Sequence, residues 1–211
     1  MISKAPVFEK IYQDYLARVA GLDLTGKQDL LGIEVDGQTI NIPFFNTTCS
    51  VSPENIVDHR GIRPPHSVCV ILCQYLLLSP DRAEDDTHLV TYRDFRDAAP
   101  YVQGFDNTAQ KPVSKAFSGR IAELEAGCRH LGGTPCDIGI SCDLSYMFEA
   151  LPRVRIYLVF NDADEDFPAD CSLLFEKQAA RYLDMECLAM IGMVLAQRLA
   201  GKDNPDMARL A

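Results

Sequence analysis

The chain has 211 residues, 47% of them hydrophobic and 24% charged, which fits one packed globular domain and excludes a disordered or fibrous protein. Its 30 acidic and 20 basic residues give a formal net charge of -10, and no run of Lys and Arg stands out that could meet phosphates. Nucleic acid and an anionic membrane surface are therefore not expected as partners.

The N-terminus and the cysteines both bear on where the protein resides. The first twenty residues mix charged and apolar side chains, unlike a secretory signal peptide. The longest apolar run, Cys187 to Ala196, is shorter than the roughly 18 residues of a membrane span, so it predicts a buried helix. Eight cysteines at spacings unlike any small disulfide scaffold indicate free thiols. We expect a cytoplasmic protein.

The first predicted elements are a helix and a hairpin. Apolar residues at three- and four-residue spacing predict a helix over residues 6 to 20. Two short β-rich runs, Leu31 to Val35 and Thr39 to Phe45, flank Asp36-Gly37. That dipeptide tolerates the positive φ angles of a tight turn, so these runs predict a β-hairpin.

The middle of the chain alternates polar connections with apolar runs. A polar stretch from Ser52 to Pro65 leads into His66 to Leu78, whose apolar character predicts a buried helix. A short strand is expected over Leu89 to Tyr92. Val113 to Leu131 keeps its apolar residues on one stripe and predicts a helix, which Gly132-Gly133 ends.

The last third predicts a β-meander followed by a helix. Its strand-like runs are Asp137 to Leu144, Val154 to Phe160 and Cys171 to Phe175, separated by turn-rich connections. A helix over residues 179 to 199, broken near Asp184, closes the ordered chain.

Together these elements predict an α+β fold. We expect a single domain over residues 1 to 200, with a largely antiparallel sheet built from the early hairpin and the C-terminal meander and covered by four or so helices. Residues 201 to 211 are expected to form a loose polar tail.

The segment Asn161 to Pro168 is the most suggestive candidate for chemistry. It places four carboxylates in a short loop between two apolar strands. Clustered oxygens suit hard cations, but the loop has no glycine, and no Glu fills the distant position that a calcium loop requires. A solvated hairpin loop is the favoured interpretation. The alternative is an enzyme that uses the Asp162 to Asp166 carboxylates as acid and base, with or without a metal.

Two groups of cysteine and histidine residues are candidates for a metal site. His66, Cys69 and Cys73 would share one face of the helix, but the chain has no C-x-x-C pair, so buried thiols are favoured. The second group has spacings that match no iron-sulfur pattern: Cys128, His130, Cys136 and Cys142. No metal site is predicted, and the sequence identifies no cofactor.

The familiar catalytic signatures are absent, since the chain has no G-x-S-x-G, G-x-x-x-x-G-K or G-x-G-x-x-G. Charged residues and glycines beside the predicted strands remain as candidates for ligand binding. Local ion pairs are the simpler role for the charged residues, and a helix stop is the simpler role for the glycines. We expect any site where Tyr92 to Phe95, Gly132-Gly133 and the Asp162 to Pro168 loop converge. The candidate ligand-binding residues are Arg93, Asp94, Gly132, Gly133, Arg153, Asp162, Asp164 and Asp166.

Several stretches, taken in order, resemble a known family. They are Leu72 to Leu77, Tyr92 to Phe95, Leu131 to Gly133, Leu151 to Arg153, Asp164 to Pro168 and Leu174-Phe175. Over about residues 5 to 200 the chain resembles an uncharacterised bacterial and archaeal family, domain of unknown function three-seven-eight-six. The resemblance implies a cytoplasmic protein, commonly of anaerobes, with relatives sometimes fused to a four-cysteine iron-sulfur module like that of corrinoid proteins. That module is missing here, and no catalytic residue carries over.

Three functions follow as hypotheses. The first is a non-enzymatic binding or accessory module that holds a small molecule or protein partner, by analogy near corrinoid or iron-sulfur metabolism. The second is the enzyme built on the acidic loop, so whether the protein is an enzyme stays open. The third is a structural homo-oligomer, such as a homodimer, that associates through Cys187 to Ala196.

Overall fold

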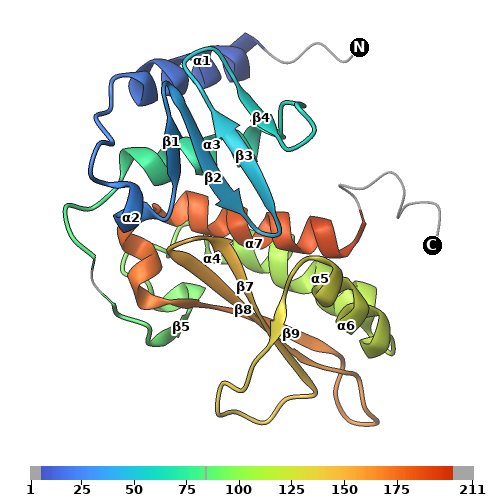
Figure 1. Ribbon diagram of the computed structural model, residues 1–211. Coiled ribbons are helices and arrows are strands. Elements are labelled where there is room, and N and C mark those ends of the chain that lie inside the picture. Colours follow the sequence, from blue (N-terminus) through green and yellow to red (C-terminus); the bar gives the residue numbers. More distant parts are fainter. Residues whose placement is uncertain (1–5, 84, 202–211) are drawn as a thin grey trace.

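A computed structural model describes residues 6–83 and 85–201, and these form two antiparallel sheets with helices packed around them (Figure 1). The first sheet has the order β1 (Glu34–Asp36), β2 (Thr39–Phe44), β3 (Thr47–Val51) and β4 (Ile56–Asp58). The second has the order β5 (Leu89–Thr91), β9 (Asp170–Glu176), β8 (Val154–Asn161), β7 (Leu144–Leu151) and β6 (Thr134–Pro135).

The helices lie on and between the two sheets (Figure 1). The α-helices are α1 (Pro6–Ala20), α2 (Gln28–Leu31), α3 (His66–Leu77), α4 (Val102–Phe105), α5 (Lys111–Phe117), α6 (Ile121–His130) and α7 (Met185–Leu199). Two short 3-10 helices, η1 (Tyr92–Asp94) and η3 (Lys177–Arg181), and a π-helical segment, η2 (Asp106–Gln110), complete the set.

The predicted α+β class is confirmed, as is the hairpin around Asp36-Gly37, which joins β1 to β2. The hairpin continues into β3 and β4, which lie outside the strands predicted from the sequence. The early strands and the meander form two separate sheets rather than parts of one. The turn between β2 and β3, Phe45-Asn46, is the place where the first sheet touches β7 of the second.

The predicted strand over Asp137 to Leu144 is wrong, because the strand begins at Leu144 and runs to Leu151. Buried side chains alternate with less buried ones along β7, as expected of a strand with one face on the core. The segment before it instead turns at Gly139, which has φ +75 and donates its N–H to the Asp137 carboxylate at 2.8 Å.

The helix predicted over Val113 to Leu131 is two helices, α5 and α6. They are separated at Gly119, whose φ of +70 lies in the left-handed region that an α-helix does not use. The predicted stop at Gly132-Gly133 is confirmed, since α6 ends at His130 and the Gly133 N–H bonds the Cys128 carbonyl at 2.9 Å.

Helix α7 is the central element of the molecule (Figure 1). It packs against α3 on the side of the first sheet and against η2 on the side of the second. The run Cys187 to Ala196 lies within this helix, and the side chains that face the core are buried. Packing within the chain therefore accounts for the apolar run that motivated the homo-oligomer hypothesis, and the oligomeric state stays a prediction.

The predicted break near Asp184 is confirmed as the N-cap of α7. The Asp184 carboxylate accepts the N–H of Cys187 at 2.8 Å and the side-chain amide of Gln74 at 2.9 Å. Replacing it with Ala removes both bonds, and we expect D184A to lower the free energy of unfolding by about 1–2 kcal/mol. Urea denaturation measures this change. D184N keeps the cap and should stay within about 0.5 kcal/mol of the wild type; equal stability of D184A and D184N would refute the assignment.

Two predictions concern the ends of the chain. The single domain over residues 1 to 200 stays a prediction, and the predicted polar tail lies outside the described residues except for Gly201. Within the part of the chain that the structure describes, every helix is too short or too polar to span a lipid bilayer.

Candidate functional site

The three segments expected to converge lie apart. Tyr92 to Phe95 follows β5, whereas Gly132-Gly133 precedes β6, and these strands form opposite edges of the second sheet. The Asp162 to Pro168 loop joins β8 to β9 in the middle of that sheet. The sheet order thus does not bring Tyr92 to Phe95 next to Gly132-Gly133, and a ligand site at these segments stays a prediction.

Several of the candidate residues make local contacts that hold the fold together. Arg153 donates to the carbonyls of Leu30 at 2.8 Å and Asp29 at 2.7 Å, where a cation suits the end of α2. Asp94 accepts hydrogen bonds from the N–H and the hydroxyl of Thr91, the N-cap residue of η1. Arg93 beside it is exposed. A side chain at Gly133 would lie 2.6 Å from Phe148, so that glycine serves close packing.

The acidic loop is a solvated turn. Asp164, Glu165 and Asp166 are exposed, and the Asp164 carboxylate accepts the N–H groups of Asp166 and Phe167 at 2.9 and 2.7 Å. Asp162 accepts the N–H of Gly119 at 2.6 Å, which ties the loop to the break between α5 and α6. The alternative of an enzyme built on this loop thus gains no support from its geometry.

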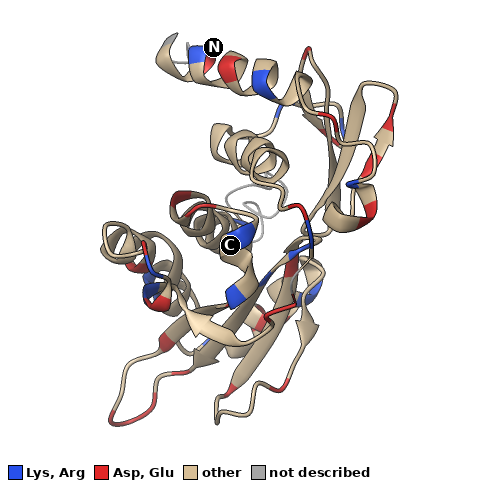
Figure 2. Cartoon of the chain, turned by 90° about the vertical axis from the view of Figure 1, so that its left-hand side faces the viewer, with Lys and Arg blue, Asp and Glu red and all other residues tan. Residues whose placement is uncertain are grey.

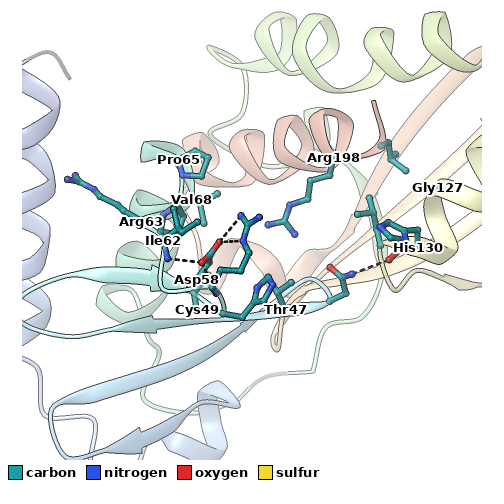
Figure 3. A pocket seen from close by; sticks show the side chains of 16 residues that line it. Thr47, Cys49, Asp58, Ile62, Arg63, Pro65, Val68, Gly127, His130 and Arg198 are labelled. Atoms are coloured by element: carbon teal, nitrogen blue, oxygen red, sulfur yellow. Dashed lines mark hydrogen bonds and ion pairs between the residues drawn. The ribbon is translucent and has the colours of Figure 1, made fainter. Parts of the chain in front are cut away.

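A pocket of about 520 Å³ lies elsewhere, between the first sheet and the C-terminal ends of α6 and α7 (Figure 3). Its walls come from β3, the β4–α3 connection, the first turn of α3, and the C-terminal ends of α6 and α7. The lining residues include Cys49, Asp58, Arg60, Val68, His130 and Arg198. This volume is in the range of small-molecule sites, which is about 300–1,000 Å³.

The pocket is basic within an acidic protein. The described residues that line it include three arginines and two histidines, but one carboxylate: Arg60, Arg63, Arg198, His59, His130 and Asp58. Acidic residues elsewhere are spread over many elements (Figure 2). The lining of the pocket therefore has more basic than acidic side chains, with Arg60 paired to Asp58 and Arg63 to Glu9.

Asp58 organises the connection between β4 and α3. Its carboxylate accepts the backbone N–H groups of Arg60 and Ile62, both at 2.9 Å, and the guanidinium of Arg60 at 3.1 and 3.0 Å. Burial alone would raise the pKa of Asp58, but these hydrogen bonds, led by that from Ile62, outweigh it and lower the pKa. The carboxylate thereby holds the loop that presents Arg60 to the pocket.

We expect D58N to lower the free energy of unfolding by about 1 kcal/mol at pH 7, because two backbone N–H groups lose a charged acceptor. Since the folded-state pKa is depressed, the stabilisation is present above the unfolded pKa of about 3.9 and is lost as the pH falls through the folded value. Urea denaturation at pH 7 and pH 3 measures both. A difference between D58N and wild type that is equal at the two pH values would contradict this role.

Two arginines at the pocket point in different directions (Figure 3). Arg63 is turned towards α1, where it pairs with Glu9 at 2.9 Å and stacks over the Tyr12 ring at 3.3 Å. Arg198 reaches from the last turn of α7 into the space above β3, with its guanidinium carbon 5.0 Å from the ring centres of Phe44 and Phe45. The Arg198 guanidinium thus lies on the β3 side of the pocket, whereas the Arg63 guanidinium is directed to α1.

The pocket wall also contains a thiol and a helix start. Cys49 is 2% exposed, and burial raises the pKa of its thiol to about 11, so it is protonated at neutral pH. Helix α3 begins with Pro65 as N-cap, which makes no side-chain capping bond. Pro65 and Val68, from this helix end, line the same pocket, and the partial positive charge of a helix N-terminus favours a nearby anion.

Sequence reasoning missed this pocket because its basic residues are far apart in the chain. A loop supplies Arg60, and two helix ends supply His130 and Arg198. These residues form no cluster in the sequence that would indicate a site. The one local signal was the polar, proline-containing stretch from Ser52 to Pro65, which supplies the β4–α3 wall. Among residues 6–83 and 85–201, no group of three or more His, Cys, Asp and Glu is placed to hold a metal ion.

Comparison with known proteins finds one family. The sequence profile described as "Domain of unknown function (DUF3786)" matches residues 23–198. This range includes every element from α2 onwards except the last residue of α7. No curated protein and no solved structure matches the chain.

Proposed function

The chain belongs to the DUF3786 family, and from its pocket we propose that it is a non-enzymatic binding module for a small organic anion. The observation that carries the proposal is the meeting of Arg60, Arg198, His59 and His130 around one cavity in a chain of net charge -10. Charge concentrated in a cleft attracts ligands of the opposite sign.

The pocket also has apolar walls, which favour an organic anion over a bare inorganic ion. The apolar side chains that line it are Ile62, Val68, Leu131 and Leu199. Small-molecule sites commonly combine such walls with a few polar groups that fix the orientation of the ligand. A carboxylate or phosphate group would meet the arginines, and the body of the ligand would contact the apolar side chains.

The lining favours binding over nucleophilic catalysis. The Cys49 thiol is buried and protonated at neutral pH, and a thiol attacks only as thiolate. The Asp58 carboxylate is occupied by Arg60 and by two backbone N–H groups. Neither group is poised as a nucleophile, which supports binding of an anion over nucleophilic catalysis as the role of this pocket.

The cellular setting belongs to the same proposal. All eight cysteines are free, which supports a reducing compartment such as the cytoplasm. The analogy with corrinoid or iron-sulfur metabolism concerns a partner of this module, and it rests on the resemblance alone.

Calorimetric titration tests the proposal, with pyrophosphate, citrate and AMP as anionic probes and adenosine as the neutral match for AMP. We expect at least one anion to bind with a dissociation constant below about 1 mM, and AMP to bind at least tenfold more tightly than adenosine. No binding of any anion at 10 mM, or equal binding of AMP and adenosine, would refute it.

A further inference from the structure

The turn between β2 and β3 contains an unusual backbone conformation. Phe45 has φ 52, and among the described residues other than glycine it alone has a positive φ. It is the first of the two turn residues that join β2 to β3, and the residues on either side of this turn, Phe44 and Thr47, pair with each other. A bulky residue is disfavoured in this region, where Gly or Asn is usual. Such strain persists where neighbouring structure holds it in place, and it is often found at ligand sites.

Contacts from the second sheet hold the turn. The Phe45 N–H donates to the Ala150 carbonyl at 3.0 Å, and the Phe45 ring lies 6.4 Å from that of Phe148. The next residue, Asn46, donates its side-chain amide to the His130 carbonyl at 3.1 Å and lines the pocket. The strained turn thus forms part of the pocket wall.

The ring of Phe45 reaches Arg198. The guanidinium carbon lies 5.0 Å from the centres of both the Phe44 and the Phe45 rings, within the range of a cation-π interaction. The two rings meet edge to face at 5.1 Å. Phe44 is fully buried in the core, whereas Phe45 is half-buried and comes from the turn itself. The guanidinium therefore rests on a two-ring surface that exists only while Phe45 keeps its strained conformation.

We propose that Phe45 is a positioning residue, whose ring holds the Arg198 guanidinium over the pocket in the orientation that meets the anionic group of a ligand. The anionic nature of that ligand rests on the proposed function. The positioning of the Arg198 guanidinium depends only on its contact with the Phe45 ring. Glycine at this position would relax the backbone but remove the ring, which explains why an aromatic residue occupies an unfavourable conformation.

The first arm of the test needs no ligand. F45L keeps a Cβ and a side chain of comparable bulk but removes the π face, and F45Y keeps the ring. We expect the NMR order parameter of the Arg198 Nε–H bond to fall in F45L and to remain at the wild-type value in F45Y. An unchanged order parameter in F45L would overturn the positioning role, even if the protein binds no anion and the proposed function fails.

The second arm measures affinity for pyrophosphate. We expect F45L to weaken binding about fivefold and F45Y to stay within about twofold of the wild type. In an R198Q background, F45L should change the affinity less than about twofold, because the two residues act through one contact. Equal weakening by F45L with and without Arg198 would show that Phe45 acts by another route and would overturn the proposal.

Discussion

Replacing Arg198 with Gln is expected to weaken pyrophosphate binding by about 10- to 100-fold. Arg198 enters the pocket from α7 and can give charge-assisted hydrogen bonds, which contribute about 1.5–3 kcal/mol each. Gln keeps much of the length of the side chain but loses the charge. The contact with the Phe44 and Phe45 rings is also lost, so we expect a fall of about 1 kcal/mol in the free energy of unfolding.

The matched control is R93Q, which removes the same charge from an exposed position outside the pocket. It also tests the sequence-based candidate site directly. Calorimetric titration at one fixed salt concentration should leave the affinity of R93Q within about twofold of the wild type, because a distant exposed charge is largely screened. If R93Q and R198Q weaken binding equally, the effect comes from net charge and not from the pocket.

Replacing Gly192 with Ala is expected to destabilise the protein by about 2 kcal/mol. An added Cβ would lie 2.4 Å from the ring of Phe105 and 3.1 Å from the Cβ of Ala109, where α7 packs on α4 and η2. The Phe105 ring cannot easily move, since it is 2% exposed and stacks on Tyr92 at 4.3 Å. Overpacking of this kind costs about 1–3 kcal/mol and outweighs the better helix propensity of Ala.

Gly127 offers a matched control within α6. Its added Cβ would meet only the Leu199 side chain, at an ordinary 3.5 Å. G127A should therefore gain about 0.5 kcal/mol from helix propensity. In thermal denaturation we expect G192A to lower Tm by about 4–8 °C and G127A to leave it unchanged or slightly raised. A G192A variant as stable as G127A would show that α7 does not pack this closely.

Local patterns were enough to predict much of the fold. Asp36-Gly37 marked its hairpin, and the break near Asp184 and the stop at Gly132-Gly133 marked helix ends, because each depends on residues adjacent in the chain. The strand predicted over Asp137 to Leu144 shows the limit of such patterns. Its apolar residues alternate as in a strand, but the segment turns at Gly139, which has φ +75 and bonds the Asp137 carboxylate.

The site could not be predicted in the same way. The pocket depends on how α7 packs, which brings Arg198 to the same cavity as Arg60 and His130 although these three residues are widely spaced along the chain. Periodicity describes one element at a time and says nothing of such meetings. The charges of the acidic loop are contiguous and therefore conspicuous in the sequence, but in the structure they are exposed to solvent on a surface loop.

The most direct test of the account is to map pyrophosphate binding by backbone amide NMR. We expect the largest chemical-shift changes at Cys49, at residues 58 to 63, at His130 and at Arg198, with none above background in residues 162 to 168. Changes confined to Arg93 or Arg153, or no changes at 10 mM pyrophosphate, would contradict the claim that this pocket binds anions.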